Sequence, residues 1–449
     1  MNNTKRDTTI VHITPHLGGG VGSCLSNFIR QSEELGVVNK VYCLDWCDYI
    51  DIELRRRVNV SQGTFWNKQD RLQSDIQKCN CVLIHYWNHP LLTVFLSRNE
   101  LPKIKSMAWC HNSGLAEPHI IPSYLTNVLD RIVFTSGSSA HIPNYEKIKS
   151  KLGTTPKVIP SVRDLREFLS IGLSRTFRSS NLKLIYVGAV TKAKMHAESA
   201  FIFAELSKQG IQIEIVGGPD HCELAKQVES LGGKVKIFGH VENVKEFYKN
   251  ADLFIYPLRV DHYGTGEQVM QEALASGLPI VAFNNSAEVT ILNQFPKIRL
   301  AKTTSEFIEI AAELVKSPVK LFELSKEVYQ RSLSISDSNK MTKDLLAVIS
   351  EVGEQIGGVS CKGSESTIAF DLIALYARAC FFDEEFFNRV LIESDRAVEL
   401  VRSKMLDGLK NLDQIDIWRL KTKSSPQHYL SYFPDDKKMS QLVIALRDL

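Results

Sequence analysis

Short apolar runs rich in β-branched residues alternate with amphipathic segments along the first 160 residues of the chain. Each run leads into glycine or polar residues, and the first leads into HLGGGVGS and an amphipathic helix. Because ligands bind at the carboxyl ends of the strands in open α/β sheets, this edge is the expected ligand edge of a first doubly wound domain. The runs predict strands at 9–14, 37–44, 81–85, 105–110 and 131–135.

The alternation of strand and helix resumes between residues 183 and 283. Such regular alternation predicts a second parallel sheet that is covered by helices on both faces. The polar stretch 163–181 is the expected interdomain linker. The fold class is therefore α/β, with Rossmann-like doubly wound domains at 1–165 and 166–355. The strands of the second domain are expected at 183–187, 212–216, 235–238, 253–256 and 280–283.

Beyond residue 356 the pattern changes to helical periodicity. Residues 356–449 are predicted to form a C-terminal helical appendage with its own core, including helical segments at 390–412 and 439–449. A module that docks a protein partner and the start of a further domain are the alternatives. Apolar side chains recur at helical spacing at Ile368, Leu372, Leu375, Tyr376, Ala379, Phe382 and Phe386.

A glycine-rich turn opens the predicted helix in the segment YGTGEQVMQEALASGLPIVA, residues 263–282. Gly264, Thr265 and Gly266 precede this helix, and Glu272 lies about two turns along it. Free N–H groups and the helix dipole make such a terminus an anion site. The segment predicts half of a nucleotide-sugar site, with the N–H groups up to Glu267 on phosphate and Glu272 near a ribose hydroxyl.

This segment resembles the signature of family 4 glycosyltransferases, which are retaining enzymes of the GT-B fold. The segments LKLIYVGAVTKAK (182–194), IEIVGGP (213–219) and VKIFGHVENVKEFYKNADLFIYP (235–257) are similar to further motifs of that family, in the same order. The resemblance covers roughly residues 8–350. It implies two domains that face a cleft, the donor bound by the second and the acceptor by the first. It also implies that the last helices of the second domain cross back onto the first.

The resemblance also implies roles for individual residues. His111 resembles a histidine that contacts the donor sugar, and His111, Lys194 and Glu272 are the implied catalytic set. The loop Gly18, Gly19 and Gly20, with His85, is expected to line the cleft. The structural alternatives are a surface position for Lys194, a solvent-facing position on its helix for Glu272 and a core position for Phe238. The implied donor-binding residues are Gly188, Lys192, Lys194, Gly217, Phe238, Gly239, Gly264, Thr265, Gly266, Glu267 and Glu272.

Two positions depart from the family pattern. The first family glutamate falls at Gly264, and an arginine that would face the diphosphate falls at Ala189. Lys192 or Arg163 is the candidate second cation.

The implied reaction moves a sugar from a nucleotide diphosphate sugar, UDP- or GDP-linked, to a glycan or lipid-linked saccharide acceptor, as in bacterial surface polysaccharide biosynthesis. Breaking the bond to the diphosphate adds negative charge to the leaving group, which cations and aimed N–H donors must stabilise. No DxD motif with supporting context is present, and Asp435 and Asp436 are expected in a solvated loop. We therefore expect neither metal nor cofactor.

The composition of the chain limits which binding partners and which cellular location are expected. A net charge of +3 argues against nucleic acid. Nine scattered cysteines and a polar start without a signal peptide suggest a cytosolic protein with reduced thiols, and no structural zinc is expected. No apolar run approaches the roughly 20 residues of a membrane span. Basic spots at 55–57 and 147–157 suggest peripheral contact with the inner face of a membrane.

Three other interpretations remain open at this stage. A non-catalytic GT-B domain that binds a sugar nucleotide or glycan within a larger assembly would explain Gly264 and Ala189. An epimerase or an inverting transferase would share the fold. A nicotinamide oxidoreductase is disfavoured because residues 18–22 do not form a spaced GxGxxG motif.

Overall fold

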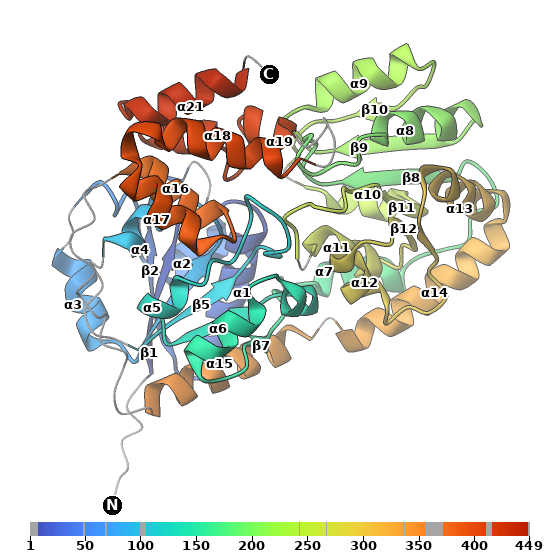
Figure 1. The fold of residues 1–449 in the computed structure, drawn as a ribbon. Coiled ribbons are helices and arrows are strands. Elements are labelled where there is room, and N and C mark those ends of the chain that lie inside the picture. Colours follow the sequence, from blue (N-terminus) through green and yellow to red (C-terminus); the bar gives the residue numbers. More distant parts are fainter. Residues whose placement is uncertain are drawn as a thin grey trace, which may run out of the picture. The chain divides into compact units, whose positions relative to one another are not determined.

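The computed structural model describes residues 8–47, 50–67, 70–98, 105–241, 243–265, 267–335, 337–354, 371–409 and 415–447. Internal contacts divide the chain into two compact units. The first unit comprises Met1–Arg163 and Ser338–Leu449, and the second comprises Asp164–Asp337. Each unit is built on one parallel sheet (Figure 1).

The first unit has a seven-stranded sheet with the order β3-β2-β1-β4-β5-β6-β7 among its described residues. Every residue of β4 and β5 is buried. Such continuous apolar runs are typical of parallel strands that are covered on both faces. The strands are β1 (Thr9–Thr14), β2 (Val38–Cys43), β3 (Val60–Ser61), β4 (Cys81–Tyr86), β5 (Ser106–Cys110), β6 (Arg131–Phe134) and β7 (Lys157–Val158).

Helices cover both faces of this sheet. Leu91 and Ile148 pack with Ile84 on one face, and Phe28 contacts His12 on the other. On that second face Cys24 meets Met341, because the chain returns from the second unit through α15 (Ser338–Glu354). The remaining helices before residue 164 are α1 (Gly19–Glu34), α2 (Ile52–Arg57), α3 (Asp70–Lys78), α4 (Pro90–Ser97), α5 (Leu125–Val128), η1 (Gly137–His141) and α6 (Tyr145–Leu152).

The C-terminal helices pack against α4 (Figure 1). Their hydrophobic core includes Val94 of α4 and extends to Phe65, so it is shared with the sheet domain. The Thr93 and Tyr429 hydroxyls lie 2.9 Å apart in the buried contact. Ile368 and residues 410–412 of the predicted helical pattern lie outside the described residues. The helices are α16 (Leu372–Cys380), α17 (Glu384–Ile392), η2 (Ser394–Arg396), α18 (Ala397–Asp407), α19 (Ile415–Arg419), α20 (Pro426–Tyr432) and α21 (Lys437–Arg447).

The second unit has a six-stranded parallel sheet with the order β10-β9-β8-β11-β12-β13 among its described residues. The strands are β8 (Lys183–Val187), β9 (Gln212–Val216), β10 (Lys236–Ile237), β11 (Leu253–Tyr256), β12 (Ile280–Phe283) and β13 (Leu300–Ala301). The helices are α7 (Arg166–Leu173), α8 (Ser199–Lys208), α9 (His221–Ser230), α10 (Lys245–Asn250), α11 (Gln268–Ala275), α12 (Ser286–Leu292), α13 (Thr304–Lys316) and α14 (Pro318–Ile335).

The prediction of a linker at 163–181 is wrong for α7. Phe168 of this helix is buried and meets Tyr248 edge to face, with ring centroids 5.5 Å apart. Just after the helix, Arg175 donates hydrogen bonds to three carbonyl oxygens of the same unit. The helix and Arg175 therefore belong to the packed structure of the second unit, whereas most residues from 173 to 181 are exposed.

Candidate functional site

Two glycine loops meet at the carboxyl ends of β8 and β9. Gly188 and Gly217 have φ angles of 151° and 137°, which favour glycine. A Cβ atom on Gly217 would lie 1.8 Å from the carbonyl oxygen of Gly188. Gly188 donates its N–H to Val216, and Gly217 donates its N–H to Gly239. The loops are thus in backbone contact, and these two amides are already used within the protein.

Phe238 and Gly239 follow β10 at the same end of the sheet. The Phe238 side chain is 43% exposed, which excludes the core position that the sequence left open. Its ring meets Phe247 edge to face at 4.8 Å. Gly239 has a φ of 63° and ends the strand in a turn. An exposed aromatic ring beside a glycine turn can face a flat ring of a ligand.

A buried ion pair joins Lys194 to Glu267. The Lys194 Nζ lies 2.9 Å from the Glu267 Oε2, and the Tyr256 hydroxyl donates to the same oxygen at 2.5 Å. Lys194 is only 8% exposed, so it is not a surface lysine. The two glycine loops and this pair all belong to the second unit.

The electrostatics keep both members of the pair charged at neutral pH. Burial acts to lower the pKa of Lys194, but the Glu267 carboxylate raises it above its usual value. Burial acts to raise the pKa of Glu267, but Lys194, His262 and the Tyr256 hydroxyl lower it to about 2. An anionic ligand at this place would therefore compete with Glu267 for the Lys194 ammonium.

The Glu267 carboxylate occupies the side-chain space of position 264. A Cβ atom on Gly264 would lie 1.6 Å from the Glu267 Oε1. The sequence left this position without a carboxylate, and the structure brings one there from three residues along the chain. Gly264 donates its N–H to the His262 Nδ1 at 3.0 Å. Thr265 is buried, and Gly266 lies outside the described residues.

Glu272 is buried on α11. Its Oε2 accepts a hydrogen bond from the Tyr248 hydroxyl at 2.8 Å, and the residue is 3% exposed. This placement excludes a solvated helix face. Contact with a ribose stays a prediction.

The sequence missed a buried cation beside Lys194. Arg259 donates its backbone N–H to the carbonyl of Lys194 and contacts the carbonyl of Lys192 through its guanidinium, at 3.0 and 3.3 Å. The guanidinium forms a two-pronged pair with Asp261 at 2.9 and 3.2 Å. Lys192 itself is exposed. Arg163 belongs to the first unit. The available signal was the position of Arg259, three residues after a buried strand.

In the first unit, His85 and His111 are in direct contact. The His85 Nδ1 lies 3.1 Å from the His111 Nε2. His85 also meets His12, a residue of β1 that the sequence did not single out, with a nitrogen-to-nitrogen distance of 3.2 Å. His85 and His12 are fully buried, and His111 is partly exposed just after β5.

The loop of Gly18, Gly19 and Gly20 opens helix α1. Gly18 donates its N–H to the His16 Nδ1 at 3.0 Å, and Gly19 has a φ of 64°. Gly19 and Gly20 are exposed. The loop follows β1 directly, so it lies at the carboxyl end of a central strand, as the sequence predicts for a ligand edge.

Helix α20 contributes side chains to that same edge. The Tyr432 hydroxyl donates to the Asp45 Oδ2 at 2.7 Å and contacts the His89 Nε2 at 3.2 Å. His428 is nearly parallel to Trp87, with ring centroids 6.1 Å apart. Asp45 and Trp87 follow β2 and β4. No local sequence signal connects α20 to these loops, so the sequence missed this contribution.

Acidic partners accompany the predicted basic spots. Lys147 and Lys151 both contact Glu384 of α17, and Lys157 pairs with Glu351. In α2, Arg57 lies 3.4 Å from Glu33. Membrane contact and a protein partner at the C-terminal helices stay predictions.

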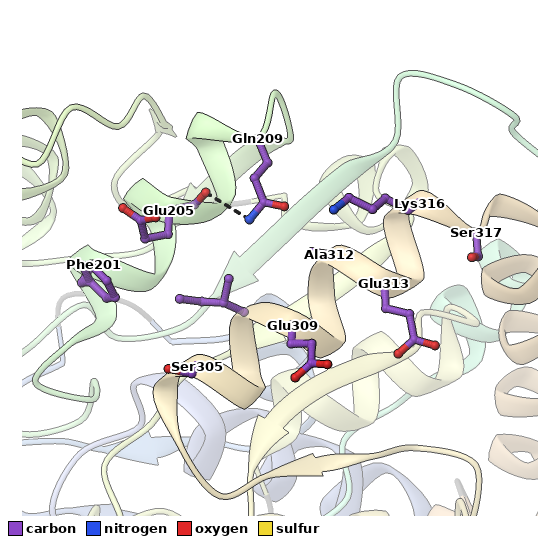
Figure 2. A pocket seen from close by; sticks show the side chains of 10 residues that line it. Phe201, Glu205, Gln209, Ser305, Glu309, Ala312, Glu313, Lys316 and Ser317 are labelled. Atoms are coloured by element: carbon purple, nitrogen blue, oxygen red, sulfur yellow. Dashed lines mark hydrogen bonds between the residues drawn. The ribbon is translucent and has the colours of Figure 1, made fainter.

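A cavity of about 580 Å³ opens between α8 and α13 (Figure 2). It lies on the helical layer of the second unit, and none of its lining residues belongs to the predicted site. The lining residues are Phe201, Glu205, Gln209, Ser305, Ile308, Glu309, Ala312, Glu313, Lys316 and Ser317.

Within the described ranges, no cluster of three or more histidine, cysteine, aspartate or glutamate residues could hold a metal ion. Among the helices that the structure describes, none combines the length and the apolar character needed to span a bilayer.

Comparison with family models finds a match in the second half of the sheet-forming region. Residues 181–316 match the model described as Glycosyl transferases group 1. The matched range lies within the second unit and includes Lys194, Glu267 and Glu272.

Solved structures with the same fold include three whose own chains are covered completely. A glycosyltransferase from Rickettsia africae has a TM-score of 0.57 at 14% identity over 78% of this chain. TarM has a TM-score of 0.58 at 10% identity over 78% of this chain. Anabaena HepE in complex with UDP and glucose has a TM-score of 0.54 at 13% identity over 77% of this chain. These likenesses show the GT-B fold, and with the family match they support a transferase of the glycosyltransferase class.

Two curated proteins match a shorter stretch. The 4-hydroxy-3-methylbut-2-enyl diphosphate reductase of Geobacter metallireducens is 25% identical over 157 residues, which is 35% of this chain and 56% of that protein. The same enzyme of Geotalea uraniireducens is 24% identical over 173 residues, 38% of this chain and 59% of that protein. The chain thus matches little more than half the length of these relatives.

Proposed function

We propose that this chain is a retaining glycosyltransferase of the family 4 type. In this proposal it moves a sugar from a UDP- or GDP-linked donor to a glycan or lipid-linked saccharide acceptor. The second unit binds the nucleotide sugar and the first binds the acceptor. A role in bacterial surface polysaccharide biosynthesis, at the cytoplasmic side, follows from the same resemblance.

The observation that carries the proposal is the buried Lys194, which pairs with Glu267, the residue directly before α11. A lysine ammonium at a helix N-terminus is suited to a diphosphate, because the ammonium and the helix dipole both favour negative charge. Such a contact strengthens as charge develops on the leaving group, and its loss should raise the barrier by about 3 kcal/mol. Glu272, buried on the same helix, is proposed to accept hydrogen bonds from the ribose hydroxyls.

In the proposed reaction an oxygen of the acceptor bonds to the anomeric carbon on the face that the diphosphate leaves. The bond from that carbon to the diphosphate oxygen breaks, and the leaving phosphate takes the acceptor's proton. His111 contacts the donor sugar, and no residue acts as a nucleophile. HepE, which shares the fold, is described in complex with UDP and glucose, and this supports a uridine donor as the first to test.

The test is calorimetric titration of the purified protein with UDP, GDP and ADP, without added metal. We expect one nucleotide to bind, and binding to be lost in Glu272→Ala. Lys194→Met should bind weakly, whereas Lys208→Ala, a lysine of α8 paired with Glu205, should bind like the unmodified protein. NMR of the product of the matching nucleotide sugar should then show the donor's anomeric configuration. No binding of any nucleotide, or an inverted product, would contradict the proposal.

One observation favours a second candidate, a non-catalytic domain that binds a sugar nucleotide. Glu267 neutralises Lys194 in the described structure, and Ala189 stands where the resemblance implies an arginine. Such a domain would bind a nucleotide but leave the donor intact. Slow hydrolysis of the donor without acceptor, abolished in Lys194→Met, would exclude this candidate.

A further inference from the structure

A chain of hydrogen bonds crosses four neighbouring strands of the first unit. Asn39 lies on β2, His12 on β1 and His85 on β4, and His111 directly follows β5. The His12 Nε2 lies 2.9 Å from the Asn39 Oδ1. The contacts from His12 to His85 and from His85 to His111 measure 3.2 and 3.1 Å between nitrogens. The four residues therefore follow one another in the hydrogen-bonded series in the same order as their strands β2, β1, β4 and β5 in the sheet.

Asn39, the member of the hydrogen-bonded series on β2, faces His12 with one particular atom of its amide, and its other contacts determine which one. The Ser32 hydroxyl donates to the carbonyl of Ile29 at 3.1 Å, so its oxygen is left to accept from the Asn39 Nδ2 at 3.0 Å. The Asn39 Nδ2 also faces the carbonyl of Val37 at 3.4 Å, a group that can only accept. The Asn39 Oδ1 is therefore the atom that meets His12, and it requires an N–H donor there.

The three imidazoles are neutral, so each carries a single N–H. Burial lowers the pKa of His12 to about 4 and of His111 to about 3, and it lowers the pKa of His85 well below its usual value. With one proton per ring, the direction of the chain is determined at every link. His12 donates from Nε2 to Asn39, His85 donates from Nε2 to His12, and His111 donates from Nε2 to His85.

We propose that Asn39, His12 and His85 form a tautomer lock that holds His111 as its Nε2–H form, so that its Nδ1 accepts a hydrogen bond from a hydroxyl of the sugar substrate. The substrate class in this inference rests on the proposed function. The chain ends at an amide oxygen, which is a poor proton acceptor, so it orients His111 and does not relay protons. Asn39, His12 and His85 are positioning residues.

The direct test is long-range ¹H–¹⁵N NMR on protein labelled with ¹⁵N-histidine, at pH 7. Signals are assigned by single histidine substitutions. We expect His12, His85 and His111 each to carry the proton on Nε2. In Asn39→Leu, which removes the acceptor at the end of the chain, we expect His111 to populate the Nδ1–H form. A proton on the Nδ1 of His111 in the unmodified protein would overturn the lock, whether or not the protein is active.

Kinetics provide the second readout. Asn39→Leu and His12→Phe should lower kcat/KM by about tenfold, the effect of one misdirected hydrogen bond. His119→Phe is the control for burial, because His119 is a buried histidine of the same unit that bonds the carbonyl of Lys423. Equal losses of kcat/KM in His119→Phe and His12→Phe would show that His12 contributes only through packing. An inactive unmodified protein with the expected tautomers would contradict only the proposed function.

Discussion

Replacing Lys194 with methionine removes one charge of a buried pair and keeps most of the side-chain volume. At 2.9 Å the attraction is about 6 kcal/mol for an effective dielectric constant of about 20, before the desolvation of both groups is subtracted. The stability that the variant loses depends mainly on the Glu267 carboxylate, which stays buried without its lysine partner. Glu267 would stay buried with the Tyr256 hydroxyl and His262 as its remaining contacts, and breaking such a pair costs about 3–5 kcal/mol. We expect the second unit to lose about 3 kcal/mol.

The assay exploits the placement of the tryptophans. All five, Trp46, Trp66, Trp87, Trp109 and Trp418, lie in the first unit, so tryptophan fluorescence reports that unit and far-UV circular dichroism reports both. In urea, Lys194→Met should move the circular dichroism transition to lower denaturant and leave the fluorescence transition in place. The double variant Lys194→Met/Glu267→Gln removes both charges and should regain most of the loss.

The pH dependence gives an internal check. The folded-state pKa of Glu267 in the unmodified protein is about 2, so its stabilising contribution is complete above the unfolded value of 4.5 and is lost as the pH falls from there toward 2. Without Lys194 the buried carboxyl takes up a proton more readily than the unfolded chain does. The difference between variant and unmodified protein should therefore shrink as the pH falls. A loss under about 0.5 kcal/mol, or a double variant no more stable than the single one, would refute this reasoning.

Three further predictions concern the rest of the fold. Burial lowers the pKa of His12 to about 4 and of His111 to about 3, so the unfolded chain binds more protons than the folded one below pH 6.5. The first unit should therefore lose on the order of 3 kcal/mol of stability per histidine on acidification. Tryptophan fluorescence that stays unchanged down to pH 4.5 would contradict this. Gly217→Ala should lower the free energy of unfolding, measured by circular dichroism, by roughly 2 kcal/mol more than Gly210→Ala does. Both glycines have a positive φ, but only Gly217 is crowded, by the carbonyl of Gly188. Equal losses in the two variants would exclude steric crowding as the cause. Trp418→Ala should destabilise the first unit by about 3–5 kcal/mol, because Trp418 stacks nearly parallel to Phe381 in the core that includes Val94. If the fluorescence transition of the other four tryptophans stayed unchanged, the C-terminal helices would unfold independently of the sheet.

The sequence by itself determined the longer strands and the loops at their carboxyl ends, but it did not predict the two-residue strands β3, β7 and β13. Parallel strands covered on both faces need continuous apolar runs, and β4 and β8 were visible for that reason. Gly188 and Gly217 were visible because positive φ angles and close backbone approach leave few alternatives to glycine. The order of these signals along the chain was enough to predict two parallel sheets.

Only the tertiary structure decided which side chains meet. The Glu267 carboxylate lies in the side-chain space of position 264, although it belongs to a residue three positions further along the chain. The histidine chain exists because β2, β1, β4 and β5 are neighbours in the sheet, although Asn39 and His111 are far apart in the sequence. Tyr432 reaches Asp45 across most of the chain. Local periodicity reports how each segment is buried, whereas these contacts depend on strand order and on where a distant helix packs, which no local pattern contains.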